Sequence, residues 1–508
     1  MRRFLILCAL CIVCAASAWA QQAKYVFYFI GDGMGLNQIN TTEYYMASAE
    51  GKWGFGHLSF ADFPYTTYAA NYSANRRVTD SAAAGTALAT GHKTNNGMLG
   101  MTPDSVNVSS IATWAKQSGK KVGVCTTVSI DDATPAAFYS HQASRKSRNA
   151  IGRQLATSGF DYFAGSDFRN PKGDDGTDLH QICEANGYTW AYGYEEGKAK
   201  WKNAKKLFMV QPKDAKREIP YAIDRREIDL TLPQIVEVGI NTLMNDNKKG
   251  FFFMIEGGAI DHACHGRDAA SAFYEVFDFN DAVKVALNFY KKHPKETLII
   301  VTADHETGGM VPGNGRYTLD LDLLKYQTCS INEVTAKINA MKKNRMKKSW
   351  EDVKQLLSEC FGLFTKVDVT WREEAELREA YEDAFEKNPT DENLYGVNFT
   401  LTTKACGILN KKAGISWASG SHSAGYVPVY AIGVGAERFH GRLNNTQIHS
   451  YRAFTDIYRW CYHRHCLPPI QIWVEDSTHS KFHTKCFARL ISHRTAKAGK
   501  IHIWHGCR

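Results

Sequence analysis

The chain has 508 residues, of which 44% are apolar, and a chain of this size can bury a large hydrophobic core. Its formal net charge is +9, but the basic excess comes from Arg2 and Arg3 and from the residues after Ile448. The long middle of the chain is therefore close to neutral. A near-neutral body without a basic stripe argues against nucleic acid as a partner.

The first 20 residues have the pattern of a secretory signal peptide. Arg2 and Arg3 precede an apolar run over residues 4–13, and residues 18–20 read Ala-Trp-Ala, a small-x-small cleavage pattern. We expect cleavage after Ala20 and export of the protein, either to a periplasm or out of the cell. A membrane anchor is the alternative, but the apolar run is too short for a stable membrane span and no second candidate follows.

The chain then alternates short apolar runs with helical stretches. Such near-continuous apolar runs are typical of strands that are buried on both faces, and Ser271–Tyr290 has the spacing of a long helix. The alternation predicts an α/β fold with a mostly parallel central sheet and helices on both faces. The expected strands are Tyr25–Ile30, Val122–Thr126, Phe251–Ile255, Leu298–Thr302 and Val427–Ile432.

Two stretches differ in composition from this alternation of apolar runs and helical stretches. Residues 168–235 are polar, with runs of Lys and Glu, whereas residues 316–400 have apolar residues at helical spacing, including Ile331, Val334 and Ile338. Ser349 and Asp352 form a plausible capping box at a helix start. We expect both stretches to be insertions that decorate one catalytic domain over residues 21–448, the second of them helical.

Residues 449–508 form an atypical C-terminal tail, which contains eight of the 18 histidines and has no sustained apolar periodicity. A metal-binding segment around Cys461 and Cys466 is one interpretation. A non-native or poorly ordered C-terminus is the interpretation that we favour, and we assign the tail no chemistry. Ten cysteines remain after Ala20, and their pairing cannot be deduced from their positions.

Polar side chains gather where the expected strands end. In an open parallel sheet, ligands bind at the carboxyl ends of the strands. Histidine nitrogens with carboxylate oxygens suit zinc, and carboxylates with a hydroxyl suit magnesium. One turn of helix would bring Asp261 and His265 onto the same face. The strand-adjacent residues are Asp32, Glu256, Asp261, His265, Asp304, His305 and His422.

Ser81 begins an alanine-rich segment that favours a helix. At a helix N-terminus the free N–H groups and the helix dipole favour an anion. A serine in this position is commonly just a helix cap. The neighbouring metal-type residues favour a nucleophile instead, because a metal ion can hold the hydroxyl as an alkoxide.

These motifs, in this order, resemble the alkaline phosphatase family from Tyr25 to about Ile448. The matching blocks are Asp80-Ser81-Ala82, residues 132–137 (Asp-Ala-Thr-Pro-Ala-Ala), Ser144-Arg145, Glu256-Gly257 with Asp261 and His265, residues 302–306 (Thr-Ala-Asp-His-Glu), and His422. Family-like sequence stops after residues 444–446.

The resemblance implies two zinc ions and one magnesium ion. The first zinc would be held by Asp261, His265 and His422. The second would be held by Asp32, Asp304 and His305, with Ser81 completing it. Magnesium would be held by Asp32, Thr134 and Glu256, with Asp132 acting through water.

The resemblance also implies that Ser81 is the nucleophile and that the Arg145 guanidinium binds two oxygens of the phosphate group. His262 would contact the phosphate through water. The implied reaction is hydrolysis of small phosphate monoesters through a phosphoserine, and a homodimer is compatible with it. The alternatives are a phosphodiesterase or sulfatase of the same fold, and a non-catalytic secreted protein that binds metal or phosphate.

Overall fold

The computed structural model describes residues 23–315, 317–343, 349–386, 392–393, 396–397 and 400–450. The expected signal peptide, and the tail from residue 451 onward, lie outside these residues, so export and the nature of the tail stay predictions. None of the described helices combines the length and the apolar character that crossing a membrane requires.

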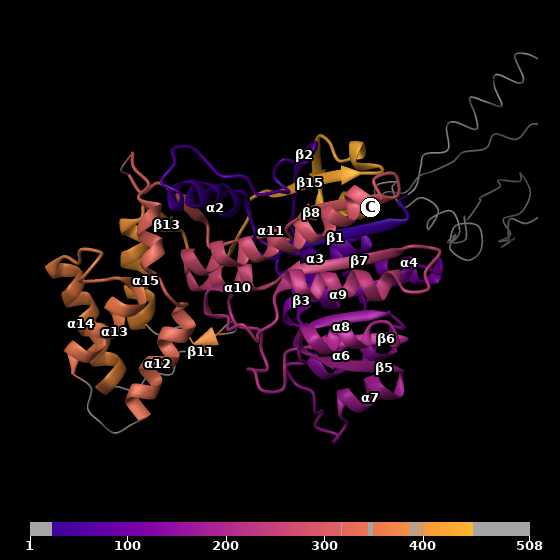
Figure 1. Ribbon diagram of the computed structural model, residues 1–508, viewed down its shortest axis with the longest axis horizontal. Coiled ribbons are helices and arrows are strands. Elements are labelled where there is room, and N and C mark those ends of the chain that lie inside the picture. Colours follow the sequence, from indigo (N-terminus) through magenta and orange to yellow (C-terminus); the bar gives the residue numbers. More distant parts are fainter. Residues whose placement is uncertain are drawn as a thin grey trace, which may run out of the picture. The chain divides into compact units, whose positions relative to one another are not determined.

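A ten-stranded sheet forms the centre of the described body (Figure 1). Its spatial order is β16-β2-β15-β8-β1-β7-β3-β4-β6-β5. The pairs from β8 through β1, β7, β3, β4 and β6 to β5 are all parallel, and β15 runs antiparallel to both β8 and β2. The strands are β1 (Tyr25–Gly31), β2 (Tyr65–Ala70), β3 (Lys121–Ser129), β4 (Tyr162–Ser166), β5 (Tyr188–Tyr192), β6 (Lys206–Val210), β7 (Phe251–Gly257), β8 (Thr297–Thr302), β15 (Val427–Gly433) and β16 (Arg442–Asn444).

Helices cover both faces of this sheet, as the sequence predicts. Alternate side chains of β1 face opposite ways: Phe29 packs against Phe279 of α11, whereas Tyr28 packs against Phe138, just after α5. The helices around the sheet are α2 (Leu36–Ala49), α3 (Ser81–Thr90), α4 (Ile111–Gln117), α5 (Ala133–Ala136), α6 (Arg148–Thr157), α7 (Leu179–Ala185), α8 (Gly193–Lys200), α9 (Leu232–Met244), α10 (Ala259–Gly266), α11 (Ala269–Lys292) and α16 (Asn445–Ser450). The predicted α/β class is confirmed.

The five predicted strands and the long helix are present, each extended by one to a few residues. The stretch 168–235 differs from the expectation, because it is not only a surface decoration. It supplies β5 and β6, which form one edge of the main sheet, together with α7 and α8. Its polar composition belongs to the helices and loops around two short strands, and this composition hides the strands in the sequence.

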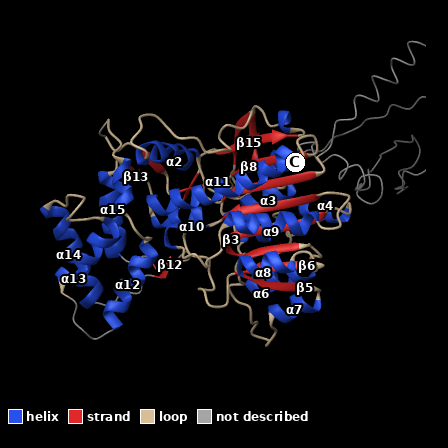
Figure 2. Cartoon of the chain, in the orientation of Figure 1, coloured by secondary structure: helices blue, strands red, loops and turns tan. Residues whose placement is uncertain are grey.

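The stretch 316–400 is helical, as expected. We call α12 (Ile331–Lys343), α13 (Trp350–Phe361), α14 (Trp371–Glu386) and α15 (Thr400–Lys412) the helical module, and Figure 2 shows these helices gathered together away from the strands of the main sheet. The predicted capping box starts α13: Ser349 Oγ accepts from Asp352 N at 3.2 Å, and the Asp352 carboxylate accepts from Ser349 N at 2.9 Å. Ile331, Val334 and Ile338 are buried in a core that also contains Tyr45 of α2 and Phe273 of α11.

The pairing of the central strands brings three of the predicted acidic positions to one edge. Ile30 of β1 lies opposite Glu256 of β7 on one side and Thr302 of β8 on the other. Asp32 lies two residues after Ile30, and Asp304 lies two residues after Thr302. Because the three strands are parallel, all three carboxylates come to the carboxyl edge of the sheet.

Candidate active site

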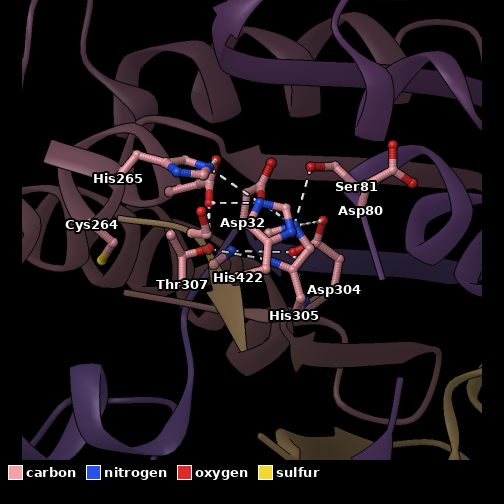
Figure 3. A network of polar contacts seen from close by, with 12 residues as sticks. Asp32, Asp80, Ser81, Cys264, His265, Asp304, His305, Thr307 and His422 are labelled. Atoms are coloured by element: carbon pink, nitrogen blue, oxygen red, sulfur yellow. Dashed lines mark hydrogen bonds and ion pairs between the residues drawn. The ribbon is translucent and has the colours of Figure 1, made fainter. Parts of the chain in front are cut away.

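Asp32, Asp304 and His305 form a buried group of potential metal ligands beyond β1 and β8 (Figure 3). His305 Nε2 lies 3.3 Å from Asp32 Oδ1 and 3.4 Å from Asp304 Oδ2. Asp304 Oδ1 accepts hydrogen bonds from the backbone N–H groups of Gly33 at 3.2 Å and His305 at 2.9 Å. Asp32 Oδ1 is buried without a hydrogen bond, which leaves this oxygen able to bind a cation.

A second group consists of Asp261, His305 and His422, which differs from the expected grouping of Asp261 with His265 and His422. His265 is nevertheless adjacent, with its Nε2 3.1 Å from His422 Nε2 and 3.3 Å from Asp261 Oδ2. The expected helical spacing of Asp261 and His265 is realised in α10. His305 stacks on His422 with ring centroids 3.6 Å apart, so the two groups are continuous through His305.

Backbone carbonyls orient two of these imidazoles. His265 Nδ1 lies 2.7 Å from Gly420 O, and His422 Nδ1 lies 2.8 Å from Thr79 O. A neutral imidazole that donates from Nδ1 keeps its Nε2 lone pair available as a ligand. Both Nε2 atoms therefore face the same point near Asp261.

Thr134 and Glu256 lie on the other side of Asp32. Thr134 Oγ1 is 3.4 Å from Asp32 Oδ2 and 3.3 Å from Asp304 Oδ2. Glu256 is buried and accepts a hydrogen bond from Thr126 Oγ1. Sequence analysis missed Thr126, although its position at the end of a predicted strand is the signal that could have pointed to it.

Ser81 is the first residue of α3, and the capping role is taken by its neighbour. Asp80 Oδ1 accepts from Ala83 N at 3.0 Å. Ser81 Oγ instead lies 3.1 Å from His305 Nε2, so it faces the metal-type cluster. Of the two interpretations of this serine, the structure favours the one in which its hydroxyl belongs to the site.

Arg145 reaches the same region from the loop before α6. Its NH2 group donates to Asp132 Oδ1 at 3.0 Å, and its NH1 group lies 3.4 Å from Asp80 Oδ2. Arg148, which sequence analysis did not single out, also donates to Asp132 Oδ1, at 3.3 Å. His262 and Asp132 both line a cavity of about 250 Å³ beside this group.

Burial and crowding set the protonation of the carboxylates. Burial, together with the charge of neighbouring carboxylates, raises the pKa of Glu256 to about 8 and that of Asp304 to about 7. Burial and the Asp304 charge also raise the pKa of Asp32 well above its usual range. Burial opposes ionisation of Asp132, yet Arg148 and Arg145 outweigh it and hold the pKa of that carboxyl below its usual value.

Two of the histidines next to these carboxylates, His305 and His422, stay neutral, whereas at His265 the Asp261 charge outweighs burial and raises the pKa. Burial lowers the pKa of both His305 and His422. The site therefore offers ligands that suit multivalent cations. These ligands are crowded buried carboxylate oxygens, one of which lacks a hydrogen bond, and neutral imidazoles. A cation would supply the positive charge that the imidazoles lack.

Comparison with known proteins agrees with this geometry. The family model described as alkaline phosphatase matches residues 23–166 and 163–456. The chain belongs to the alkaline phosphatase family. It is 33% identical over 386 residues to alkaline phosphatase 4 of Bacillus subtilis (strain 168), covering 73% of this chain and 74% of the relative. Alkaline phosphatase 3 of the same organism is 31% identical over 438 residues, covering 84% of this chain and 87% of the relative.

Solved alkaline phosphatases share the fold. The Thermus thermophilus enzyme superposes with a TM-score of 0.72 at 27% identity, covering 85% of this chain and 91% of that one. A cold-active alkaline phosphatase from a psychrophilic Shewanella gives a TM-score of 0.71 at 27% identity, covering 84% and 98%. The predicted family, fold and enzyme class are confirmed.

The raised carboxyl pKa values predict how the metal-free alkaline phosphatase responds to pH. Glu256 and Asp304 have higher pKa values when folded than their ordinary values of 4.5 and 3.8, so above these values the folded state binds more protons than the unfolded state. Between about pH 7 and 8, where ordinary histidines are mostly neutral, stability should therefore fall as pH rises. The slope would approach about 1.4 kcal/mol per pH unit for each extra bound proton.

Urea unfolding of the chelator-treated protein across this range measures the slope. Zinc with magnesium should abolish it, because the carboxylates would then be ionised against the cations. The Glu256→Gln variant should show a shallower slope without metal. A stability that rises with pH in the metal-free protein would contradict the assignment of a carboxylate-crowded site.

Proposed function

We propose that this chain hydrolyses phosphate monoesters, with Ser81 as the nucleophile. The observation that carries the proposal is the position of Ser81 Oγ, 3.1 Å from His305 Nε2 at the start of α3, inside a buried set of carboxylates and imidazoles. Membership of the alkaline phosphatase family and the names of its relatives support the same reaction.

We further propose two zinc ions and one magnesium ion, held by the residue sets that the sequence predicts. The fit is supported by the group of Asp32, Asp304 and His305, by the approach of His265 Nε2 to Asp261 Oδ2 at 3.3 Å, and by the Asp32 oxygen that lacks a hydrogen bond. A mutant of the TAB5 alkaline phosphatase, with a TM-score of 0.60 and 26% identity to this chain, is described as having Mg bound. When bound, such ions would neutralise phosphate charge and favour ionisation of the serine hydroxyl.

The chain's own residues would position the ester. Ser81 Oγ attacks phosphorus, the new Oγ–P bond forms, and the bond from phosphorus to the alcohol oxygen breaks. The N-terminus of α3, where Ser81 lies, would direct the positive end of the helix dipole toward the phosphate group. Water then cleaves the phosphoserine and restores the serine hydroxyl.

Arg145 would bind two non-bridging oxygens through its planar guanidinium. Asp132 and Asp80 contact this guanidinium at 3.0 Å and 3.4 Å, which keeps it close to Ser81 before substrate binds. His262 would contact the phosphate through water, from the same side as Asp132. Electrostatic stabilisation by preorganised charges is the main contribution that phosphoryl transfer asks of a protein.

The reaction class is tested with three aryl substrates. We expect the metal-loaded protein to hydrolyse an aryl phosphate monoester faster than an aryl phosphate diester or an aryl sulfate, because Arg145 and the cations suit a dianion. A chelator should remove the activity, and zinc with magnesium should restore it. Faster cleavage of the diester or the sulfate would favour the alternatives of the same fold, and no turnover at all would favour a binding protein.

The nucleophile is tested by Ser81→Ala. The variant should lose the phosphoenzyme and nearly all turnover, whereas metal content stays close to that of the wild type because serine is one ligand among several. Radiolabelled phosphate, trapped on the protein at low pH, gives the readout. Ser118→Ala, at the end of α4, is the matched control and should label normally. Label on the Ser81→Ala variant would identify a different nucleophile.

The phosphate contact is tested by Arg145→Ala. Losing a charge-assisted hydrogen-bonding partner costs about 1.5–3 kcal/mol, so inhibition by inorganic phosphate should weaken roughly ten- to a hundred-fold. Arg153→Ala removes a more exposed ion pair with Asp175 and should leave the inhibition constant unchanged. An unchanged constant for Arg145→Ala would show that Arg145 does not bind the phosphate group.

A further inference from the structure

Two cysteines, one just before the helical module and one within it, contact the same lysine far from Ser81 in the sequence. Cys329 precedes α12 and Cys360 is the penultimate residue of α13. Their backbones are joined where Thr328 N donates to Cys360 O at 2.9 Å, and Thr328 Oγ1 donates to Glu359 O at 3.0 Å. The two residues are 6% and 2% exposed.

One ammonium group contacts both sulfurs. Lys337 Nζ lies 3.7 Å from Cys329 Sγ and 3.8 Å from Cys360 Sγ, so both sulfurs are within contact distance of the same nitrogen atom. Burial alone would lower the pKa of Lys337, but the neighbouring sulfurs outweigh it and raise that pKa. The lysine is therefore a permanent positive charge beside the pair.

This arrangement makes the two sulfurs unequal. The neighbouring Cys329 thiol, together with Lys337, lowers the pKa of Cys360, whereas Cys360 raises the pKa of Cys329. The other four described free cysteines behave differently, because burial raises the pKa of each; they are Cys125, Cys183, Cys264 and Cys406. A thiol with a lowered pKa beside a second thiol favours disulfide formation, because the thiolate is the form that attacks.

We propose that Cys329 and Cys360 are joined by a disulfide in the mature protein, linking the start of α12 to the end of α13. The oxidant is a small-molecule or protein disulfide. The Cys360 thiolate attacks one oxidant sulfur, a mixed disulfide forms, and the first thiol leaves. Cys329 then gives up its proton to solvent and attacks Cys360 Sγ, and the second thiol leaves. The cysteines lose two protons and two electrons, and the oxidant gains them.

The disulfide would hold in place the start of α12, which packs beside α10, the helix that carries Asp261 and His265. Asp268, the N-cap of α11, accepts hydrogen bonds from Ile331 N at 2.9 Å and from Gln327 Nε2 at 2.7 Å. Asp268 closely follows α10, which carries Asp261 and His265. Closing the loop between the two cysteines reduces the conformational freedom of the unfolded module. The cross-link would therefore stabilise the packing beside α10 without touching the substrate.

The test is cysteine mapping of the full chain. Because both sulfurs are buried, the chain is refolded with zinc and magnesium in a glutathione redox buffer, then denatured in N-ethylmaleimide, digested and analysed by mass spectrometry. We expect a Cys329–Cys360 cross-linked peptide, two hydrogens lighter than its parts, which disappears after reduction. Alkylation of both cysteines without reduction would overturn the proposal. Separate glutathione adducts, or a bond to another cysteine or to Lys337, would also overturn it.

Three variants provide an independent readout. Reductant should lower the Tm of the wild type by several degrees, and should not shift the Tm of Cys329→Ser, Cys360→Ser or the double variant. Cys183→Ser, which removes a buried thiol of α7, is the matched control and should keep the reductant-dependent shift. Equal shifts in all proteins would overturn the proposal. Should a variant fail to fold, the peptide map of the wild type decides alone.

Discussion

The repulsion among buried carboxylates at the carboxyl edge of the sheet is the constraint around which the rest of this structure is arranged. Asp32, Glu256 and Asp304 converge because β1, β7 and β8 are parallel neighbours in matched register. Burial and mutual repulsion both disfavour their charged forms, which is why their pKa values are raised. The neighbouring imidazoles give these three carboxylates little positive charge, since His305 and His422 are held neutral and the raised pKa of His265 is due to Asp261. A site of this kind is most stable when cations occupy it.

The groups around this cluster are arranged so that its reactive atoms stay available. Asp80 caps α3, so the Ser81 hydroxyl can face His305. Gly420 and Thr79 carbonyls accept from the outer nitrogens of His265 and His422, which keeps their Nε2 atoms directed inward. Asp132 and Asp261 are exceptions among the carboxylates. Burial opposes ionisation of both, but two arginines outweigh it at Asp132 and His265 outweighs it at Asp261, so both pKa values are lowered. Asp132 in turn keeps Arg145 close to the serine.

The helical module has its own core but is not independent of the site. Its core is shared with Tyr45 of α2 and Phe273 of α11, and Asp268 connects the start of α12 to the segment just after α10. Adding a Cβ at Gly266, the last residue of α10, would bring it within 2.7 Å of the Ile331 side chain, so the two helices pack closely. Stabilising the base of the module, as the proposed Cys329–Cys360 bond would, therefore also restrains the helix that presents Asp261 and His265.

Sequence alone determined the features that depend on local pattern or on residue chemistry. Apolar runs buried on both faces predicted five strands of the sheet, the Ser349–Asp352 pair predicted the start of α13, and the ordered Asp, His, Glu and Ser motifs predicted the family. Tertiary structure decided what depends on residues that are distant in the chain. It places His305 in both ligand groups. It also brings Thr126 to Glu256 and Arg148 to Asp132, and it brings Cys329 and Cys360 to the same lysine. It also decided that β5 and β6 extend the sheet, which their polar flanks conceal. Periodicity and capping can be read from local sequence. The partner of a buried polar group depends instead on strand register and helix packing, which are established only when distant segments of the chain come together.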